Sequence, residues 1–398
     1  MERKGRLGFF PARYGDGVVG GAEAVLREMA HGLARRGWDV DIFTTCARDH
    51  FTWENVFPPG SEEVEDGVVL HRFPAVISTA RAERAAFNAA IVAGSPLRLS
   101  DQERWMNDDL RLPDLFHHLL DHSDSYRALV FAPYLFWPAF ACGQVAPDRT
   151  ILMPCLHDEP EARLDIFQPI FSGSRGLWFL SDPERDLARS IQPRLADHEV
   201  IGSGIDVPAA YDPEGFRRRH GIDGPFVVYA GRREGGKNWD AMLRAFARAV
   251  VNAELPLSLV TMGHGVVDAP PEIADRVIDL GYVTDEERND ALAAAVGYIQ
   301  PSAYESFSRT IMEAWLAGTM VIATGASAVN RWHCERSGAG LVYDDDDEFE
   351  ECLRFVAEAP DAANRLADPG RDYVLSNYTW PPVLDAVERT IDAWLPWS

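Results

Sequence analysis

Short apolar runs alternate with amphipathic stretches along the first half of the chain, which predicts β-strands alternating with α-helices. The first run covers residues 7–10, and the amphipathic stretch 20–36 after it places Val25, Met29 and Leu33 on one helical face. Further strands are predicted over residues 39–45, 68–73, 128–132, 150–154 and 176–180. This strand–helix–strand order indicates a parallel, doubly wound sheet.

A second alternating series follows the glycine-containing boundary at 202–204. Its predicted strands cover residues 226–230, 257–262, 277–280, 297–300 and 320–323. We therefore expect an α/β protein with two Rossmann-like domains, residues 1–200 and 201–375, and a C-terminal helix, 376–398, that returns to the first domain. Ligands bind in such folds at the carboxyl ends of the strands, here in a cleft between the halves.

The composition fits a soluble globular protein and narrows the choice of partners. The 398 residues are 46% hydrophobic and 25% charged, and their formal net charge is −24. This charge argues against nucleic acid and against an anionic membrane surface as partners, although solubility alone explains it as well. The five scattered cysteines have no metal-ligand spacing, and the first apolar run is too short for a signal peptide or a membrane anchor. We expect a cytoplasmic protein without a structural metal.

A glycine-rich segment with two bases, residues 229–238, follows the first predicted strand of the second half. Lysine occurs in the chain only at Lys4 and Lys237, so the interior Lys237 stands out among the arginines. Arg232 offers a planar fork of donors and Lys237 a compact charge, which together could neutralise a diphosphate, while Gly231 lets the backbone approach. The alternative is an ordinary exposed turn.

Two glutamates, Glu305 and Glu313, lie eight positions apart around a predicted helix start near Phe307. The unpaired N–H groups of a helix start, here at Ser306, Phe307 and Ser308, suit a phosphate, and a carboxylate on either side can accept from hydroxyls. A phosphate between two hydroxyl-bearing groups is the arrangement of a nucleotide-sugar, in which a diphosphate joins a sugar to a ribose. The two carboxylates are roughly 12 Å apart along a helix axis, too far for the ~5 Å pair of a retaining hydrolase. Their spacing suits the binding of one extended ligand, although two glutamates eight positions apart at a helix start also occur by chance.

The segment Gly281-Tyr282-Val283 ends another strand of the second half, where its backbone amides could read a nucleobase edge. The alternative is a plain strand-to-helix turn with Asp285 as the N-cap.

Two positions of the first half are further candidates. Gly20 and Gly21 open the first helix and permit close approach of a phosphate or sugar, or simply provide the torsions of the helix entry. His157 follows a strand and could donate to a sugar hydroxyl, although a bond to Asp158 in the turn is an equal alternative.

Together these motifs resemble the retaining GT-B glycosyltransferases of family 4. The resemblance covers nearly the whole chain and is carried by four elements: Gly20-Gly21-Ala22-Glu23, Gly231-Arg232 with Lys237, Gly281-Tyr282-Val283, and Glu305 to Glu313 followed by Ala317-Gly318. It implies a GT-B fold, a nucleoside-diphosphate sugar as donor substrate, and no metal or other cofactor.

The resemblance also implies roles for individual residues. Arg232 and Lys237 would bind the donor diphosphate, Glu305 the hydroxyls of the transferred sugar and Glu313 the ribose, with His157 near the donor sugar. The chain departs from the family pattern at Ser308, where glycine is common, and at Arg309, where an apolar residue is common.

We therefore expect transfer of a hexose, with retention, to a hydroxyl of a soluble acceptor, in antibiotic or other natural-product or saccharide biosynthesis. Trp105, Met106, Phe116 and His117 are candidates for an acceptor wall, or they pack a helical layer. The alternatives are another GT-B enzyme (an epimerase or phosphorylase), a non-catalytic sugar-nucleotide-binding protein, or an NAD-dependent oxidoreductase. The last rests on a lone G-x-G-x-x-G spacing at residues 15–20.

Overall fold

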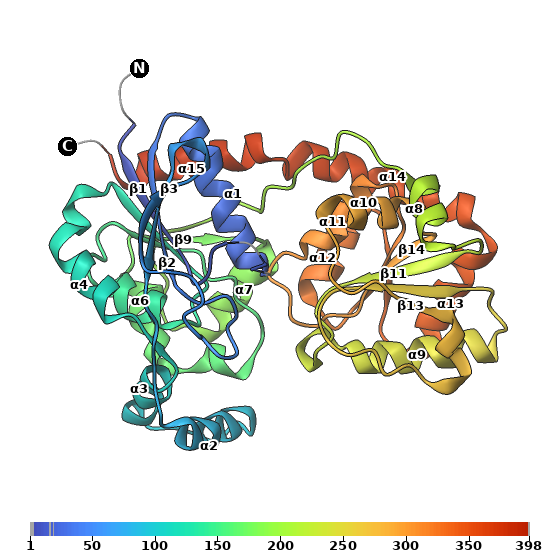
Figure 1. Ribbon diagram of the computed structural model, residues 1–398, viewed down its shortest axis with the longest axis horizontal. Helices are drawn as coiled ribbons and strands as arrows, with labels where there is room; N and C mark the ends of the chain where they lie inside the picture. Colours follow the sequence, from blue (N-terminus) through green and yellow to red (C-terminus); the bar gives the residue numbers. More distant parts are fainter. Residues whose placement is uncertain (1–3, 16, 19, 397–398) are drawn as a thin grey trace. The chain divides into compact units, whose positions relative to one another are not determined.

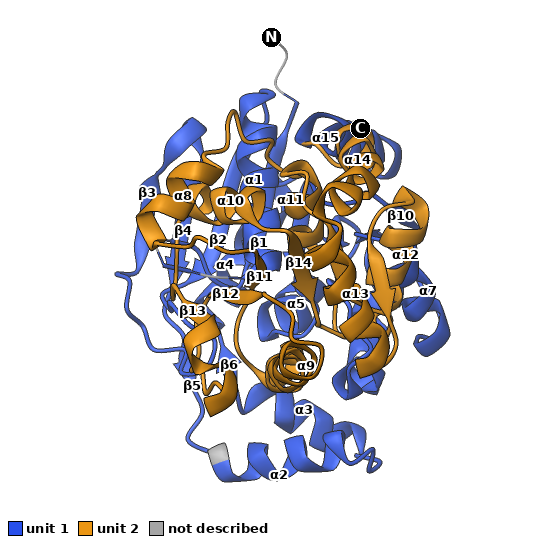
Figure 2. Cartoon of the chain, turned by 90° about the vertical axis from the view of Figure 1, so that its right-hand side faces the viewer, with its two compact units in different colours: residues 1–204, 380–398 blue, residues 205–379 orange. Residues whose placement is uncertain are grey.

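The computed structural model describes residues 4–15, 17–18 and 20–396 of the chain. The chain divides into two compact units, Met1–Gly204 with Trp380–Ser398, and Ile205–Thr379 (Figures 1 and 2). The sequence placed these divisions after residues 200 and 375, whereas the units divide after residues 204 and 379. Within the G-x-G-x-x-G spacing, residues 16 and 19 lie outside the described residues.

Unit 1 is built on an eight-stranded sheet with the strand order β10-β9-β8-β7-β1-β2-β4-β3. Neighbouring strands are parallel except for the edge pair β3–β4. The central strand β7 is apolar and buried throughout, because both of its faces are covered, as is usual in parallel sheets. The strands are β1 (Arg6–Pro11), β2 (Asp39–Thr45), β3 (Gly60–Glu63), β4 (Val69–Phe73), β7 (Ala128–Ala132), β8 (Thr150–Leu152), β9 (Gly176–Phe179) and β10 (His198–Val200).

The helices of unit 1 include one from the far end of the chain. They are α1 (Gly21–Arg35), α2 (Arg81–Val92), α3 (Leu99–Asn107), α4 (Pro113–His122), α5 (Trp137–Ala141), α6 (Gln168–Gly173), α7 (Asp182–Ile191) and α15 (Trp380–Trp394). A separate two-stranded sheet pairs β5 (Val76–Ile77) with β6 (Leu110–Arg111).

Helix α15 packs closely against unit 1, and two glycines permit the approach. The indole Nε1 of Trp178 on β9 donates to Thr390 Oγ1 on α15 at 2.9 Å. A Cβ at Gly176 would lie 2.3 Å from the Trp394 ring, and one at Gly204 would lie 2.2 Å from the Trp380 ring.

Unit 2 contains a six-stranded, fully parallel sheet with the order β13-β12-β11-β14-β15-β16. Chain order therefore reverses between β11 and β14, and in open α/β sheets the carboxyl ends at such a reversal form the ligand crevice. The strands are β11 (Phe226–Ala230), β12 (Ser258–Met262), β13 (Val277–Asp279), β14 (Gly297–Gln300), β15 (Val321–Thr324) and β16 (Leu341–Tyr343).

Helices cover both faces of this sheet. Figure 1 shows α9 and α13 on one face and α8, α10 and α11 on the other, and the apolar sides of α9 and α13 form one core with the sheet. The helices are α8 (Pro213–His220), α9 (Trp239–Asn252), α10 (Asp285–Ala294), α11 (Arg309–Leu316), α12 (Ala328–Ser337), α13 (Asp346–Glu358) and α14 (Pro360–Asn377).

The sequence predicted the other strands and missed β3, β5, β6, β10 and β16, which are short and lie at sheet edges. Strand β3 has four exposed residues and no apolar position, so it carries no strand pattern. Residues 75–125 contain α2, α3 and α4 together with the β5–β6 pair.

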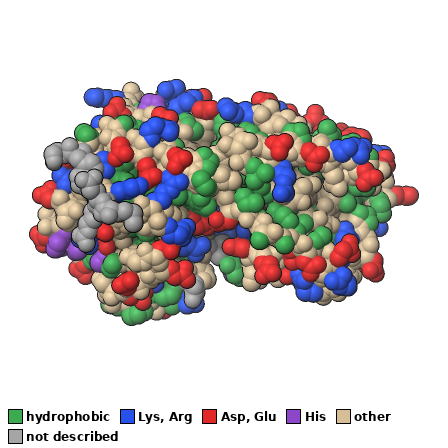
Figure 3. Space-filling model, turned by 90° about the horizontal axis from the view of Figure 1, so that it is seen from above, with side chains coloured by type: hydrophobic (Ala, Val, Ile, Leu, Met, Phe, Trp, Pro, Cys, Tyr) green, Lys and Arg blue, Asp and Glu red, His purple; other side chains and the backbone are tan. Residues whose placement is uncertain are grey.

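The surface carries both signs of charge. On the face drawn in Figure 3, acidic side chains are interspersed with basic ones and do not gather in one patch. None of the helices in the described part of the chain has the length and apolarity needed to cross a bilayer.

Candidate functional site

An ion pair joins two loops at the reversal point of the unit 2 sheet. One loop follows β11 and carries Lys237, and the other follows β14 and carries Glu305. Lys237 Nζ lies 2.7 Å from Glu305 Oε1 and donates to it. The structure therefore brings two of the predicted site residues into direct contact where the topology places a ligand crevice.

A backbone hydrogen bond to β12 and a tyrosine hydroxyl hold the loop after β11. Gly231 N–H donates to Met262 O at 2.9 Å, and the Tyr229 hydroxyl donates to Arg232 O at 2.6 Å. The Arg232 guanidinium is half-buried and lies 3.1 Å from the carboxylate of Glu234. Arg232 is thus positioned at the strand end, in an ion pair with a neighbour in its own loop.

Arg233, which the sequence did not single out, is the buried arginine of this loop, with a side chain that is 1% exposed. Its guanidinium donates to Thr261 Oγ1 (3.1 Å), to Gly263 O (2.8 Å) and to Gly265 O (2.9 Å), and forms an ion pair with Asp279. It ties the ends of β11, β12 and β13 together. Two adjacent arginines in a glycine-rich segment look alike in a sequence, so no signal could have shown which one is buried.

The helix after β14 begins later than predicted. Helix α11 starts at Arg309, and Ser308 is its N-cap with φ 66° and ψ 62°. This left-handed conformation costs a non-glycine residue about 1–2 kcal/mol. The cost gives a physical reason why glycine is common at this position in the family that the sequence resembles. The Ser308 hydroxyl accepts from Gln300 Nε2 at 2.7 Å, which helps to hold the turn.

Phe307, a predicted donor-binding residue, turns its side chain into the core. It is 2% exposed, and its ring meets the rings of His333 and Tyr378 edge-on, with both centroids 5.0 Å away. Only the backbone of Phe307 is left for a ligand contact. Ser306 beside it is half-buried, and Ile311 N–H in the first turn of α11 donates to Ser308 O at 3.1 Å.

Glu313 lies on α11, and its carboxylate is bound by an arginine that the sequence did not single out. Arg288 on α10 donates from Nε to Oε2 at 2.9 Å and from Nη2 to Oε1 at 3.1 Å. Burial alone would lower the pKa of Arg288, but the carboxylates of Glu313 and Asp285 raise it, so the guanidinium stays charged. The N-cap of α10 is Thr284, whose hydroxyl accepts from Glu287 N, so the alternative with Asp285 as the cap is wrong.

Tyr282 presents an exposed aromatic ring at the end of β13. It is 58% exposed and stacks on His264, with ring centroids 5.2 Å apart and planes at 13°. Gly281 has φ 63°, and its carbonyl accepts from Gly263 N at 2.7 Å, which ties the loops after β12 and β13 together. Val283, next in the chain, is half-buried.

In unit 1, Gly20 and Gly21 differ in what surrounds them. A Cβ at Gly20 would lie 2.1 Å from a Glu23 carboxylate oxygen, while one at Gly21 meets nothing within 4 Å. The Glu23 carboxylate accepts from Arg13 Nε (2.8 Å) and Nη2 (2.6 Å), and both side chains are buried. Gly20 is therefore required by the packing of this ion pair.

His157 lies in the loop after β8, half-buried, with Nδ1 3.7 Å from Glu159 Oε2. Asp158 pairs with Arg163 at 2.5 Å, so the alternative of a His157–Asp158 bond is wrong.

The loop that carries His157 is anchored by Glu184. This buried carboxylate accepts from Leu156 N at 2.7 Å and from Leu180 N at 2.6 Å, and burial raises its pKa to about 8. The sequence indicates a helix start that includes Glu184, because Ser181 and Glu184 match the S-x-x-E capping pattern. In the structure, Ser181 Oγ accepts from Glu184 N.

The four candidates for an acceptor wall differ in how far they are buried. Trp105 and Met106 are buried in the core of unit 1, and the Trp105 indole donates to Asn88 at 2.6 Å, so these two pack the helical layer. Phe116 is partly buried against the same core, and His117 is exposed.

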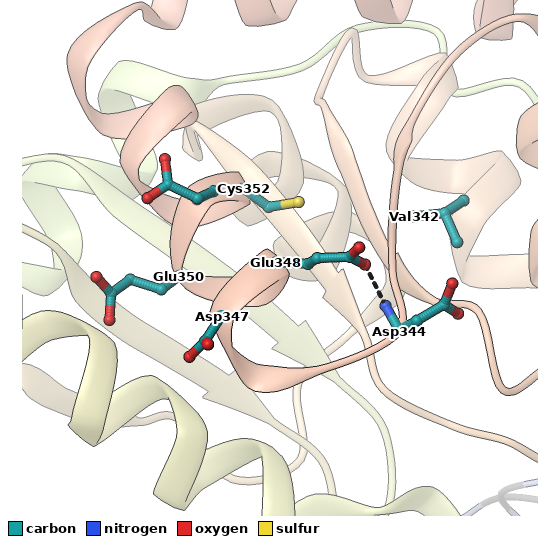
Figure 4. A pocket seen from close by; sticks show the side chains of 7 residues that line it. Val342, Asp344, Asp347, Glu348, Glu350 and Cys352 are labelled. Atoms are coloured by element: carbon teal, nitrogen blue, oxygen red, sulfur yellow. Dashed lines mark hydrogen bonds between the residues drawn. The ribbon is translucent and has the colours of Figure 1, made fainter.

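A hollow of about 650 Å³ in unit 2 lies between the end of β16 and the first turns of α13 (Figure 4). Asp344, Asp347, Glu348, Glu350 and Glu351 line it with Val342 and Cys352. Its carboxylates would repel a phosphate, so it does not compete with the Lys237 loop as a diphosphate site. Among the described residues, no group of three or more His, Cys, Asp or Glu side chains could hold a metal ion.

Two doubly wound α/β units, one with charged loops at its reversal point, define a class of proteins that bind ligands at strand ends. Comparison with known families makes the class specific. Residues 20–142 match the model described as "Glycosyl transferase 4-like domain". Residues 224–358 match "Glycosyl transferases group 1".

Curated relatives agree with this family. D-inositol 3-phosphate glycosyltransferase of Pseudarthrobacter chlorophenolicus is 24% identical over 90% of this chain and 86% of its own length. GDP-mannose-dependent alpha-mannosyltransferase of Mycolicibacterium smegmatis is 32% identical over 52% of this chain, and the match covers 56% of that relative.

A solved structure shows the same fold. HepE of Anabaena, determined in complex with UDP-glucose, superposes with a TM-score of 0.70 at 14% identity, covering 98% of this chain and 99% of that one. The chain belongs to the GT-B glycosyltransferases of the group 1, family 4 type. The predicted fold class and enzyme class are confirmed, and the oxidoreductase alternative is not.

Proposed function

We propose that the enzyme transfers a hexose from a nucleoside-diphosphate sugar to a hydroxyl of a soluble acceptor, with retention of the anomeric configuration. The observation that carries the proposal is the Lys237–Glu305 pair of 2.7 Å at the β11/β14 reversal point. It sets a cation for the diphosphate beside a carboxylate for the sugar hydroxyls, at the place where α/β sheets bind nucleotides.

The leaving group of this reaction is a nucleoside diphosphate, on which negative charge grows in the transition state. Lys237, Arg232 and the N-terminal turn of α11 supply positive charge and N–H donors there, which is the role a metal ion fills in other enzymes. Lys237 must exchange its bond to Glu305 for one to a phosphate oxygen. Glu305 then accepts from the sugar, and Glu313 from the ribose.

Unit 1 supplies further candidates for the same reaction. His157, in the loop held by Glu184, is the proposed group near the donor sugar. Gly20 and Gly21 remain proposed for donor approach at the start of α1, although the packing of Glu23 explains Gly20 without a ligand.

Substrates are proposed from the chemistry of the chain and from its relatives. The relative named GDP-mannose-dependent alpha-mannosyltransferase supports a nucleoside-diphosphate hexose as the donor. The net charge of −24 favours a soluble polyol or saccharide acceptor over an anionic membrane lipid. A place in natural-product biosynthesis and a cytoplasmic location complete the proposal, with no nucleic acid and no cofactor required.

A thermal-shift panel of UDP-, GDP-, ADP- and dTDP-hexoses tests the donor. A hexose donor that binds the folded protein should raise the melting temperature in proportion to the logarithm of its concentration. The best donor is then incubated with polyol and saccharide acceptors, and the anomeric configuration of the product is read by NMR. An inverted product would contradict retention, and an epimerised donor would point to an epimerase. Release of sugar 1-phosphate from a saccharide when inorganic phosphate is added would point to a phosphorylase.

A further inference from the structure

Arg288 is the cation in direct contact with Glu313, the carboxylate to which the proposed function assigns the ribose. Two parallel bonds of 2.9 and 3.1 Å join the guanidinium edge to the two carboxylate oxygens. A third bond, from Nη1 to Asp285 Oδ1 at 2.7 Å, anchors the guanidinium to its own helix. Such a paired geometry fixes both planar groups relative to each other.

The pair is accessible to a ligand. The side chain of Arg288 is 26% exposed and that of Glu313 is 14% exposed. A guanidinium has five N–H donors, and contacts among the described residues use three of them. A carboxylate has about four acceptor positions, so donors and acceptors remain side by side on one rigid unit.

This combination suits a vicinal diol. A carboxylate only accepts and a guanidinium only donates, whereas each hydroxyl of a diol does both. We propose that Arg288 is a specificity-determining residue that forms, with Glu313, a clamp for the 2′,3′-diol of a ribose. The enzyme then accepts ribonucleoside-diphosphate sugars and discriminates against 2′-deoxyribonucleoside donors. This inference rests on the proposed function, because it concerns the same donor.

The size of the effect follows from the charged partners. Loss of the 2′-hydroxyl removes one charge-assisted hydrogen bond and leaves a polar group of the clamp unmatched, which should lower kcat/KM about tenfold to a hundredfold. Replacement of Arg288 by leucine removes the donor half of the clamp, so the preference should fall below about threefold.

The test measures kcat/KM for UDP-hexose and GDP-hexose and for their 2′-deoxy forms, with the wild type, Arg288→Leu and Arg288→Lys. The ribose-to-deoxyribose ratio is independent of the active fraction, so a partly folded variant still gives an answer. Arg288→Lys, which keeps a charge without the planar fork, should have an intermediate ratio. An unchanged ratio in Arg288→Leu with a lower melting temperature would reduce the pair to a structural link between α10 and α11.

A matched control lies on the neighbouring helix. Arg219 forms ion pairs of 3.0 Å with Glu287 and of 3.0 Å with Asp290, both on α10, and does not touch Glu313. Arg219→Leu should leave the ribose-to-deoxyribose ratio at its wild-type value.

Calorimetry with UDP, GDP and their 2′-deoxy forms separates the clamp from the proposed function. Turnover of ribose and deoxyribose donors at equal efficiency by the wild type would overturn the clamp and leave sugar transfer intact. A ribose preference in binding that Arg288→Leu loses, without turnover of any sugar donor, would retain the clamp and overturn the proposed function. Absence of nucleotide binding would overturn both.

Discussion

Lys237 and Glu305 are the residues whose geometry carries most of the proposed chemistry. Each holds the other by a single charged hydrogen bond of 2.7 Å, so each is already oriented before a donor arrives. The pair is half-buried, which strengthens its interaction with a charged ligand relative to a fully solvated one. In the proposed reaction, a donor diphosphate competes with Glu305 for the lysine, and the released carboxylate becomes an acceptor for the sugar.

Lys237→Ala should lower kcat about a hundredfold to a thousandfold and raise KM much less, because the lysine stabilises charge that grows only in the transition state. Steady-state kinetics measure both constants. Lys4, the other lysine of the chain, pairs with Glu388 at 2.8 Å in unit 1 and provides the control Lys4→Ala. A fall in kcat of less than threefold in Lys237→Ala would remove the lysine from the mechanism.

Ser308 makes the strain at the start of α11 measurable. Alanine and glycine at this position both lose the bond from Gln300, but only alanine keeps the left-handed penalty. Ser308→Gly should therefore be more stable than Ser308→Ala by about 1 kcal/mol in urea unfolding. Equal stabilities would show that the φ of 66° is not strained in solution.

His333 makes the stability of unit 2 dependent on pH. It is fully buried, and its Nδ1 lies 3.0 Å from the Tyr373 hydroxyl. Burial lowers its pKa to about 3, so the folded state binds its proton less readily than the unfolded state does. The contribution of His333 to the free energy of unfolding should be constant above pH 6.5 and fall toward pH 3, by at most about 1.4 kcal/mol per pH unit.

Urea titrations of the wild type and of His333→Phe between pH 7.5 and 4 give the measurement. The variant should lose part of the acid-side slope. Identical slopes in the two proteins would place the acid sensitivity elsewhere.

At the level of elements, the sequence predicted the features that depend on hydrophobic periodicity and on the order of strands and helices. The apolar runs of β11 and β14 were enough to place Gly231 directly after one strand and Glu305 in the loop before the helix that follows the other. The start of α11 was predicted too early, because nothing in the sequence shows that Ser308 adopts a left-handed conformation. Arg233 and Arg288 were missed because their partners, Asp279 and Glu313, are distant in sequence.

Helix α15 illustrates how an element far along the chain completes unit 1. Gly176→Ala should destabilise the protein by about 1–3 kcal/mol, because the added methyl group collides with the Trp394 ring. Gly173→Ala, at a glycine whose Cβ position is open, is the control and should change stability little. Thermal unfolding compares the two variants, and equal melting temperatures would contradict the close packing of α15.

For the molecule as a whole, each unit matches its own half of the family: residues 20–142 in unit 1 and 224–358 in unit 2. The donor-binding prediction concerns unit 2, whose reversal point gathers Arg232, Lys237 and Glu305. The net charge of −24 belongs to the whole chain, whereas at the reversal point each of the two bases, Arg232 and Lys237, is paired with one carboxylate. A strongly negative protein can therefore still bind an anionic donor, through a few bases held at one crevice.

The most direct measurement is a crystal structure of the protein with its best nucleoside-diphosphate hexose bound. The diphosphate should lie within hydrogen-bond distance of Lys237 Nζ and of the first N–H groups of α11, with the hexose at Glu305 and the ribose at Glu313. A donor bound anywhere else, with the Lys237–Glu305 pair still closed, would contradict the account.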